Sequence, residues 1–595
     1  RMIGTGLIGG KSSGFLLARA ILKKHDPRIW EDRLEPHDSF YIGSDVFYTF
    51  LVQNGVWWIR QQQRDPELFL KDLGRARSQI MSGSFPHYII KQFVDLLDYF
   101  GQWPFIVRSS SLMEDNFGNV FAGKYESVFC VNQGTRGERL AGFIDAVRRI
   151  YASSISEKAL IYRKQRGLLD RDEQMALLIQ RVSGVNYEKY FFPQAAGVGF
   201  SYNPYSWDDK VDPDAGMIRL VFGLGTRAVN RSDDDYTRVI ALNVPEMQPL
   251  AGLSSRKYSQ HLVDVLDLST NHLVALPFKK VLEQCPGLSP DLFAEQDRQL
   301  QARARKMGIK NAFTRVLNFS GLLSRTEFTR DMKNMLKTLE KVYGSTVDIE
   351  FTVNFFQQEH IDGPRAREAS WNYMINLVQC RPLEIRGSGL SMNQAGRIEQ
   401  KDLIMESTGP VIGHSRIDKI DRIIYVSPEK YGYLPEKDRH AVARLVGKTA
   451  GQPDCRECFN IMLVGPGRWG TSIASLGVAV TFTEISSVSV LCEIVAMRGD
   501  FAPDVSLGTH FFSDLIEFDI LYLALYPERP GNFLNHSLLI GSGNRLTDIF
   551  PEESRWRDTL YVLDTHALFP GRSLYICSDV KKQQVRCYLS YDQPG

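Results

Sequence analysis

The sequence predicts a fold of the α/β (α+β) class that is divided into more than one domain. Patterns typical of amphipathic helices alternate along the chain with short apolar runs that are typical of strands. At 595 residues the chain also exceeds the length at which a single hydrophobic core keeps growing. We therefore expect roughly two to four domains, each with its own core.

Apolar residues at helical spacing predict four of the longer helices. The clearest covers residues 87–101, where the apolar residues share one face and Gly101 closes the helix. The others begin near Ser12 and cover about 138–164 and 327–343.

Short apolar runs bounded by turn residues predict the strands. The first part of the chain contains FIVRSS, MALLIQRV, AAGVGFSYNP, MIRLVFGLG, DIEF and NLVQCRP, and the part beyond residue 400 contains RIIYVS, FNIMLV, VAVTF and VLCEIVA. Residues 355–371 are polar and rich in turn formers, so we expect a long hairpin loop between DIEF and NLVQCRP.

Composition argues against several classes of protein. Apolar residues make up 43% of the chain, charged residues 24%, and no stretch approaches the roughly 20 apolar residues of a membrane helix. The 71 basic and 69 acidic residues nearly cancel, so neither a membrane nor a nucleic acid is an expected partner. Eight cysteines without a secretory leader favour the reducing cytoplasm. The chain opens on Arg1 rather than on Met, which leaves open that it is a piece of a longer protein.

A glycine-rich segment opens the chain and leads into the first predicted helix. Its glycines fit GxGxxG, but a dinucleotide-binding motif needs a preceding strand for which there is no room. Residues 10–12 read GKS, like the end of a P-loop, but Thr5 stands where that motif needs its first glycine. We therefore expect only a flexible loop that presents Lys11 to an anion.

Two runs far apart in the sequence predict the opposite walls of an ATP site, residues 105–129 and residues 348–384. In the first run Arg108 ends an apolar strand, where a guanidinium can bind two phosphate oxygens at once. Three following serines add hydroxyl donors, and a glycine-containing turn lets the backbone approach a ligand closely. The alternative is an ion pair of Arg108 with Glu114 or Asp115.

The second wall offers ligands for a divalent metal. Alternation within DIEF puts Asp348 and Glu350 on one face of a strand. The same rule puts Gln379 and Arg381 on one face of the partner strand. A carboxylate opposite a glutamine oxygen suits Mg²⁺, which takes few protein oxygens and completes its shell with phosphates and water. The alternative is a buried ion pair between Glu350 and Arg381.

These runs form an ordered series that resembles a known family. VRSSSLMED, FAGKYES, LLIQRV, AAGVGFSYNP, FGLG, DIEF and VQCRP follow a GGK loop in this order. Over roughly residues 2–385 the series is similar to the nucleotide-binding domain of the phosphoenolpyruvate synthase and pyruvate phosphate dikinase family, which glucan dikinases and rifampin phosphotransferase share. The resemblance implies an ATP-grasp fold that binds ATP between two subdomains, with Mg²⁺ bridging the phosphates.

The same resemblance implies roles for individual residues. It makes Arg108 and Arg381 the catalytic arginines. It assigns phosphate contacts to Lys11, Arg108, Gly123 and Ser127, the position beside the adenine to Gln180, metal binding to Glu350 and Gln379, and assistance at the transferring phosphate to Arg381.

The chain also departs from the family pattern. Thr226 stands where the family often has the glutamate of GLGE, and the hairpin loop at 355–371 is longer than usual. The family passes phosphate through a histidine in a Thr-Ser-His-Ala run. The nearest run here, at 468–480, has Ile473 at that position. This segment therefore does not supply the histidine of such a relay.

The C-terminal part offers two kinds of candidate site. His510 is a catalytic candidate because Asp514, one helical turn further on, can orient its imidazole, and His414 is a weaker one. In the turn GPGRWG, Arg468 can bind a carboxylate or phosphate of the acceptor while Trp469 covers a sugar or ring. The alternatives are a structural histidine and a tight turn with a capping arginine.

Together these observations predict an ATP-grasp nucleotide-binding domain at 1–385, a linker at 386–402 and a divergent α/β domain at 403–595, with a further boundary near 500 left open. We expect an ATP- and Mg²⁺-dependent phosphotransferase with a small-molecule acceptor that the sequence does not identify. Two alternatives stay open. One is a true dikinase, which makes AMP and phosphate and has its histidine domain outside this sequence. The other is a non-catalytic ATP-binding sensor or assembly protein. The oligomeric state is also open.

Overall fold

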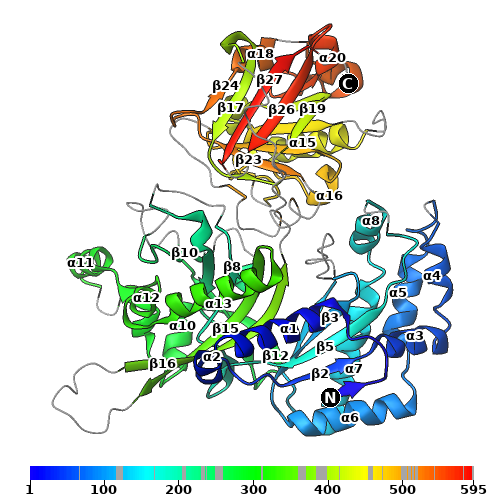
Figure 1. Cartoon of the computed structure of the whole chain (residues 1–595), viewed down its shortest axis with the longest axis vertical. Helices are drawn as coiled ribbons and strands as arrows, with labels where there is room; N and C mark the ends of the chain where they lie inside the picture. Colours follow the sequence, from blue (N-terminus) through cyan, green and yellow to red (C-terminus); the bar gives the residue numbers. More distant parts are fainter. Residues whose placement is uncertain are drawn as a thin grey trace. The chain divides into compact units, whose positions relative to one another are not determined.

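The computed structural model of the chain divides into two compact units (Figure 1). The first comprises Arg1–Asn203 and Trp207–Glu384, and the second comprises Pro204–Ser206 and Ile385–Gly595. No helix in the described part of the chain is long and apolar enough to cross a membrane. Structure is described for residues 1–65, 67–114, 125–165, 168–203, 210–229, 235, 237–247, 259–309, 312–358, 370–382, 398–413, 416–452, 460–471, 474–497, 505–506, 511, 515, 520–541, 543–579 and 582–591.

Two five-stranded sheets carry most of the residues that the sequence singles out in the first unit. One sheet contains, in spatial order, β1 (Met2–Ile3), β2 (Ser39–Ile42), β5 (Met175–Arg181), β3 (Phe105–Ser111) and β4 (Ser127–Cys130). The other contains β10 (Arg238–Ala241), β9 (Met217–Val221), β8 (Ala195–Phe200), β15 (Val347–Gln358) and β16 (Ser370–Pro382), all antiparallel to their neighbours.

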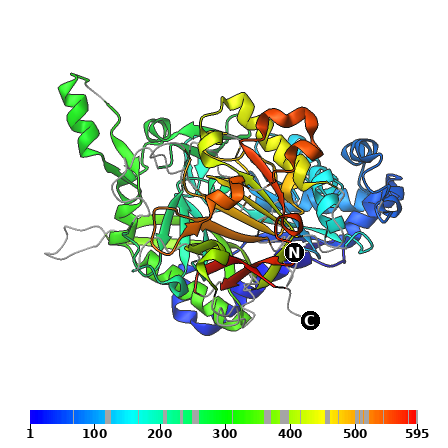
Figure 2. The same ribbon diagram turned by 90° about the horizontal axis from the view of Figure 1, so that it is seen from above.

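Smaller sheets complete this unit. A four-stranded sheet runs in the order β12 (His272–Pro277), β11 (Leu262–Asp267), β7 (Tyr190–Phe192) and β6 (Val185–Tyr187). Strands β13 (Ala294–Gln296) and β14 (Arg315–Leu317) pair with each other. Helix α11 (Arg298–Lys306) lies between them in the sequence and stands out from the unit in Figure 2.

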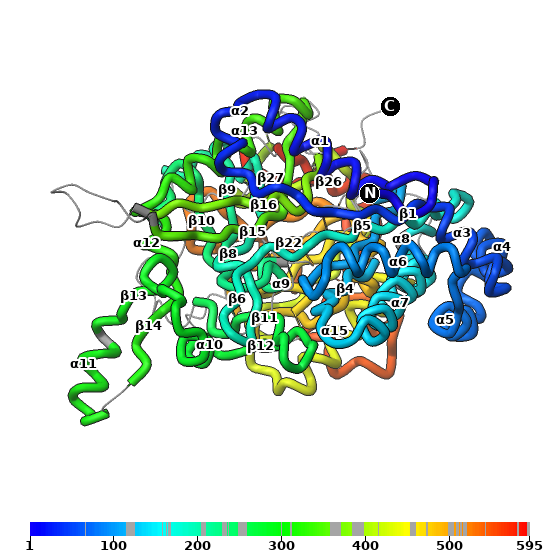
Figure 3. Tube along the Cα trace, turned by 90° about the horizontal axis from the view of Figure 1, so that it is seen from below, coloured from blue at the N-terminus to red at the C-terminus, as the bar shows by residue number. Residues whose placement is uncertain are grey.

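Helix α1 (Gly9–His25) lies along β16 of one five-stranded sheet (Figure 3) and also packs against β3 of the other. Glycines make this close packing possible. A Cβ atom at Gly9, where φ is +79°, would lie 1.5 Å from the carbonyl oxygen of Ser110, and one at Gly14 would lie 2.6 Å from that of Cys380. The helix begins at Gly9 rather than near Ser12. Lys11 therefore lies in its first turn and not in the expected flexible loop.

Two of the other expected helices are confirmed as α6 (His87–Phe100) and α13 (Phe328–Tyr343). The helical region expected at about 138–164 consists of two helices, α7 (Arg136–Ser153) and α8 (Glu157–Gln165). A capping box of Thr135 and Glu138 starts α7. The remaining helices of this unit are α2 (Pro27–Arg33), α3 (Ser44–Gln53), α4 (Trp58–Gln62), α5 (Leu73–Ser82), α9 (Thr226–Val229), α10 (Phe278–Gln284) and α12 (Ser320–Arg325).

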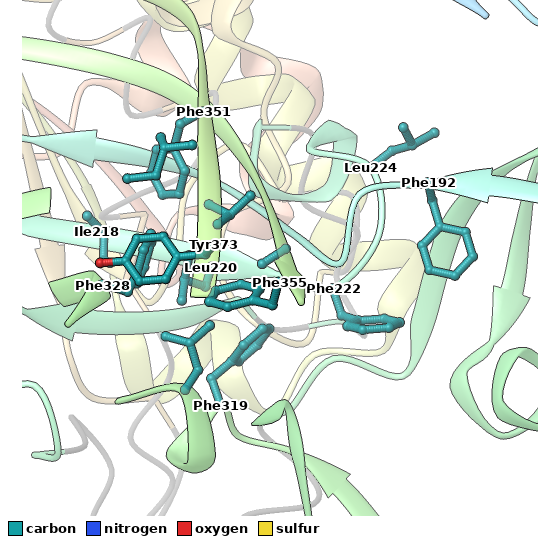
Figure 4. Close-up of a cluster of buried hydrophobic side chains, with 14 of the residues drawn as sticks. Phe192, Ile218, Leu220, Phe222, Leu224, Phe319, Phe328, Phe351, Phe355 and Tyr373 are labelled. Carbon is teal, nitrogen blue, oxygen red and sulfur yellow. The ribbon is translucent and has the colours of Figure 1, made fainter. Parts of the chain in front are cut away.

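An aromatic core lies between α13 and the face of the second five-stranded sheet that packs against it (Figure 4). The ring of Phe328 lies 6.0 Å from that of Phe351 and 6.2 Å from that of Phe355, and Tyr373 completes the group. Each such pair contributes about 0.5–1.5 kcal/mol beyond the apolar area that it buries. This core fixes one face of β15 and leaves its other face to polar residues.

Strands β15 and β16 form a long hairpin with one irregularity. Glu350 lies opposite Gln379, but the next residue, Phe351, lies opposite Leu377, so Val378 is an extra residue on β16. The strands reach Gln358 and resume at Ser370, so they extend into the region expected to be loop.

The second unit has a mixed six-stranded sheet and an antiparallel five-stranded one. The first runs β18 (Val411–Ile412), β23 (Leu521–Leu525), β22 (Val490–Ile494), β21 (Ile461–Pro466), β20 (Arg422–Val426), β25 (Leu560–Asp564), with β20 to β23 parallel. The second runs β19 (Ile417–Ile420), β26 (Ser573–Asp579), β27 (Gln584–Ser590), β17 (Leu403–Thr408), β24 (Phe533–Leu534). The helices among the described residues of this unit are α14 (Pro428–Gly432), α15 (Glu436–Ala450), α16 (Phe482–Ile485), α18 (His536–Gly541), α19 (Leu546–Ile549) and α20 (Thr565–Leu568).

The six-stranded sheet is buried on both faces. Along β20, Ile424 and Val426 join the core on the side of α15, whereas Ile423 and Tyr425 join the core on the side of the five-stranded sheet. The runs RIIYVS, FNIMLV and VLCEIVA are thus confirmed as strands. The run VAVTF is not a strand: it lies in irregular chain that leads into α16, whose first turn carries its own capping box.

Replacement of Gly9 by Ala should destabilise the first unit by more than about 1 kcal/mol, because the backbone conformation and the Ser110 carbonyl both exclude a methyl group. Gly142→Ala is the matched control. Gly142 lies within α7 with open space around it, so alanine should be neutral or should stabilise the helix by about 0.5–1 kcal/mol. Urea denaturation measures both effects, and equal midpoints for the two variants would contradict the predicted close packing of α1.

Candidate active site

Arg108 connects the two five-stranded sheets of the first unit. Its Nη2 donates to Glu350 Oε2 at 2.6 Å and to Gln379 Oε1 at 2.7 Å. The side chain is buried, with Arg108 only 7% exposed, and its Nε and Nη1 have no hydrogen-bond partner within the part of the chain that the structure describes. Arg108 lies in the middle of β3 and not at the end of a strand as expected, because the strand continues through Ser111.

The register of the hairpin explains why these two oxygens meet. Glu350 and Gln379 are direct cross-strand neighbours, so their side chains leave the sheet side by side. Both reach the same nitrogen of Arg108. Two oxygen atoms from opposite strands thus converge on one cationic point, which is the arrangement expected of a small metal site with two protein ligands.

A second ion pair lies one step along the hairpin. Arg381 Nε donates to both carboxylate oxygens of Asp348, at 2.8 and 2.7 Å, and the two residues are cross-strand neighbours. Burial raises the pKa of Asp348, although Arg381 opposes that shift. Burial alone would also raise the pKa of Glu350, but Arg108 and Lys11 outweigh it and the pKa is lowered. Glu350 is therefore ionised at neutral pH.

These contacts correct both ion pairs that the sequence offered as alternatives. Arg381 pairs with Asp348 and not with Glu350, because strand register places the two in direct opposition. Arg108 pairs with Glu350 and not with Glu114. Asp115, the other alternative partner, lies outside the described residues.

Lys11 lies beside the same strand as Arg108. Its Nζ lies 3.0 Å from Glu114 Oε1 and 3.4 Å from Ser109 Oγ. Glu114 is itself buried and accepts hydrogen bonds from the Ser109 hydroxyl and the Ser111 amide, each at 2.8 Å. This network fixes the ammonium group next to β3. An acidic residue after a run of serines is its one signal in the sequence.

The glycine-rich segment does bind an anion, but the anion belongs to the chain. The amides of Thr5 and Gly6 donate to the carboxylate of Asp45, at 2.9 and 2.7 Å. The predicted hydroxyl donors are similarly engaged, since Ser110 donates to the Ile8 carbonyl at 2.7 Å and Ser111 to Glu173. In this state the loop and the serines stabilise the surroundings of the site.

Two further predicted residues lie near Arg108. Ser127 begins β4 directly opposite Arg108 and is exposed. Gln180 on β5 is buried, and its Nε2 lies 3.3 Å from the carbonyl oxygen of Val378, the extra residue of the hairpin. Its Oε1 accepts no hydrogen bond from any described residue. Gly123, predicted to line the triphosphate, lies outside the described residues.

The candidate residues of the second unit are either buried or outside the described residues. Trp469 is 0% exposed and packs in the core between the six-stranded sheet and α15, so its expected role of covering a ligand ring is wrong. Its backbone amide donates to Glu493 at 2.8 Å. Arg468 is buried as well. His510, Asp514, His414 and Ile473 lie outside the described residues.

Glu493 is a buried residue that the sequence analysis missed, since it stands alone in the apolar run VLCEIVA. Besides Trp469, it accepts hydrogen bonds from the Ser506 amide at 2.7 Å and the Tyr522 hydroxyl at 2.6 Å. Burial raises the pKa of Glu493 to about 7, while these hydrogen bonds oppose the shift. Because it binds these three segments together, we interpret it as structural.

Within the described residues, no group of three or more His, Cys, Asp or Glu side chains could hold a metal ion. The Glu350–Gln379 pair is a different kind of donor set, made of one carboxylate and one amide oxygen. Such a pair fits Mg²⁺, which usually takes one or two protein ligands and obtains the others from water and phosphate.

Comparison with known proteins places most of the chain in a family of nucleotide-binding domains. Residues 5–402 match the family described as pyruvate phosphate dikinase, AMP/ATP-binding domain. The chain belongs to this family, which confirms the resemblance seen in the sequence motifs and supports ATP as the nucleotide.

Curated relatives match shorter parts of the chain. Rifampicin phosphotransferase of Bacillus subtilis is 28% identical over 158 residues, which are 26% of this chain and 16% of that protein. The Bacillus cereus protein of the same name is 28% identical over 194 residues, or 32% and 20%. Probable phosphoenolpyruvate synthase of Archaeoglobus fulgidus is 32% identical over 124 residues, or 21% and 14%. The matched segments thus span at most a fifth of these relatives' own lengths.

Replacement of Arg381 by Met should lower the free energy of unfolding by about 3–5 kcal/mol, because it leaves the buried carboxylate of Asp348 without its partner. Combining it with Asp348→Leu should recover part of that loss, since the unpaired charge is removed as well. The control is Arg557→Met, which breaks an exposed pair with Asp558 and should change stability by at most about 1 kcal/mol. Denaturation curves in which the double variant is less stable than Arg381→Met would contradict the pairing.

Proposed function

We propose that this chain is the nucleotide-binding part of an ATP- and Mg²⁺-dependent phosphotransferase with an ATP-grasp domain over residues 1–385. The observation that carries the proposal is the convergence of Glu350 and Gln379 on Arg108, within the segment that matches the dikinase AMP/ATP-binding family. Phosphoryl transfer needs positioned cations around the phosphates and little covalent chemistry from the protein. The site concentrates such groups.

Each residue of the site would contact a different part of the nucleotide. Arg108 would bind phosphate oxygens through a planar guanidinium, and Lys11, anchored beside the same strand, would add a second positive charge. Arg381 would stabilise charge at the transferring phosphate from the neighbouring strand position. Ser127 and Gly123 would line the triphosphate, and Gln180 would lie beside the adenine, where its unpartnered Oε1 can accept a hydrogen bond from the base.

Glu350 and Gln379 would bind the metal ion. Bound Mg²⁺ would supply charge neutralisation of the phosphate oxygens. The lowered pKa of Glu350 supports this role, because a metal ligand must be deprotonated at working pH.

The acceptor is a small molecule that the second unit, following a linker at 386–402, would bind. The relatives' names suggest rifampicin and pyruvate as first compounds to screen. Arg468 remains the residue of that unit proposed to contact the acceptor, with His510 as a proposed catalytic group. Because the described cysteines are free thiols, they support the proposed cytoplasmic location.

Incubation of the protein with ATP, Mg²⁺ and candidate acceptors tests the proposed activity directly. Chromatography of the nucleotides should show net conversion of ATP when a true acceptor is present. ADP as the product would indicate a simple kinase, and AMP with phosphate would indicate dikinase chemistry. If ATP binds tightly but stays unchanged across the screen, the result would contradict the proposed phosphotransferase activity and would favour an ATP-binding sensor.

Replacement of Glu350 by Gln should lower kcat by about 10²-fold or more, because the neutral amide binds Mg²⁺ more weakly and leaves Arg108 without its carboxylate. Glu283→Gln is the matched control: it makes the same chemical change at an exposed residue of α10 and should keep full activity. Turnover by Glu350→Gln at the wild-type rate would remove Glu350 from the site.

A further inference from the structure

Arg108 occupies the point at which the proposed metal ligands converge. Its Nη2 lies 2.6 Å from Glu350 Oε2 and 2.7 Å from Gln379 Oε1, and neither distance leaves room for another atom between. A metal ion that bound both oxygens at the roughly 2.0–2.1 Å typical of Mg²⁺ would need the volume that Nη2 fills. The two cations also repel each other. Arg108 and a metal ion therefore exclude one another at this pair of oxygens.

The rest of the Arg108 side chain is prepared for a different partner. Nε and Nη1 are buried and have no hydrogen-bond acceptor among the described residues, although a guanidinium has five donors to satisfy. Phosphate oxygens are strong acceptors with the geometry that this group binds best. A bound triphosphate would thus attract Arg108 away from Glu350 and Gln379 and would satisfy donors that are now unpaired.

Lys11 provides a contrast. It also carries a positive charge close enough to lower the pKa of Glu350, but its ammonium group is bound to Glu114 and Ser109. Among the described side chains that contribute positive charge near Glu350, Arg108 is the one seen in contact with both converging oxygens.

We infer that Arg108 is the resident cation of this metal site and releases Glu350 and Gln379 only when phosphates bind its guanidinium. This inference rests on the proposed ATP site and adds a coupling to it. The metal site is closed in the empty protein, so a divalent ion binds weakly by itself and tightly together with the nucleotide. The exchange would prevent the empty site from collecting metal ions.

The test measures Mn²⁺ binding to the whole 595-residue chain without any nucleotide, followed by the EPR signal of the free ion. Wild type should bind Mn²⁺ weakly, and Arg108→Met should bind it about tenfold or more tightly, because the competing cation is gone. Lys11→Met is the matched control, since it removes the same charge without vacating the oxygens. Its affinity should stay within about threefold of wild type.

Two outcomes would overturn the inference. One is equal nucleotide-free Mn²⁺ affinity for wild type and Arg108→Met, and the other is an equal gain for Lys11→Met, which would reduce the effect to general electrostatics. Arg108→Gln repeats the measurement with a polar side chain if the Met variant does not fold. As a second readout, Mn²⁺ should raise the melting temperature of the Arg108 variant more than that of wild type.

The same assay separates the inference from the proposed function. Wild type that binds Mn²⁺ with a nonhydrolysable ATP analogue, but whose empty site is unaffected by Arg108→Met, would keep the ATP site and reject the exchange. Protein that binds neither the analogue nor Mn²⁺ under any condition would reject both.

Discussion

The contact of one guanidinium with an oxygen pair on the opposite sheet is the interaction on which the first unit depends. Arg108 is buried, and a buried cation is tolerated only where anionic or polar oxygens surround it. Glu350 and Gln379 supply them, and in doing so they fix the separation of the two five-stranded sheets at this point. Helix α1 reinforces the same junction, because its glycines let it pack against a strand of each sheet.

Each cationic group of the site is paired with an anionic group of the protein itself. Arg108 has Glu350, Arg381 has Asp348, Lys11 has Glu114, and even the amides of the glycine loop have Asp45. A polyanionic ligand would therefore enter by competition rather than by filling unoccupied positive charge. Such a site favours ligands that bring both anionic oxygens and a compensating cation, because binding then leaves the carboxylates neutralised.

The sequence patterns predicted which polar residues lie on the two walls of this site, but not which of them form ion pairs with one another. Alternation within DIEF and VQCRP identified the polar faces, since a strand repeats every two residues and needs no tertiary information. Which cation meets which carboxylate depends on cross-strand register and on packing between sheets, and no local pattern encodes either. The same limit explains Trp469. A tryptophan in a glycine turn suggests a ligand surface, whereas the two-sided burial of the six-stranded sheet draws it into the core. The start of α1 was misplaced because glycine disfavours helices, and only the nearby Ser110 carbonyl explains its presence there.

The extra residue Val378 affects which changes of sequence this hairpin can accept. Strict alternation from Leu377 would turn Gln379 toward the aromatic core, and the single inserted position shifts the phase so that it faces Arg108 instead. Before the extra residue, the alternation of β16 places apolar side chains in the aromatic core. After it, the alternation places Gln379 on the face of Arg108. A hairpin without Val378 would keep Gln379 opposite Glu350, because Leu377 and Gln379 would then be consecutive residues of a regular ladder. The position of Val378 is therefore the point at which this strand can lose a residue without turning its polar side chains into the core.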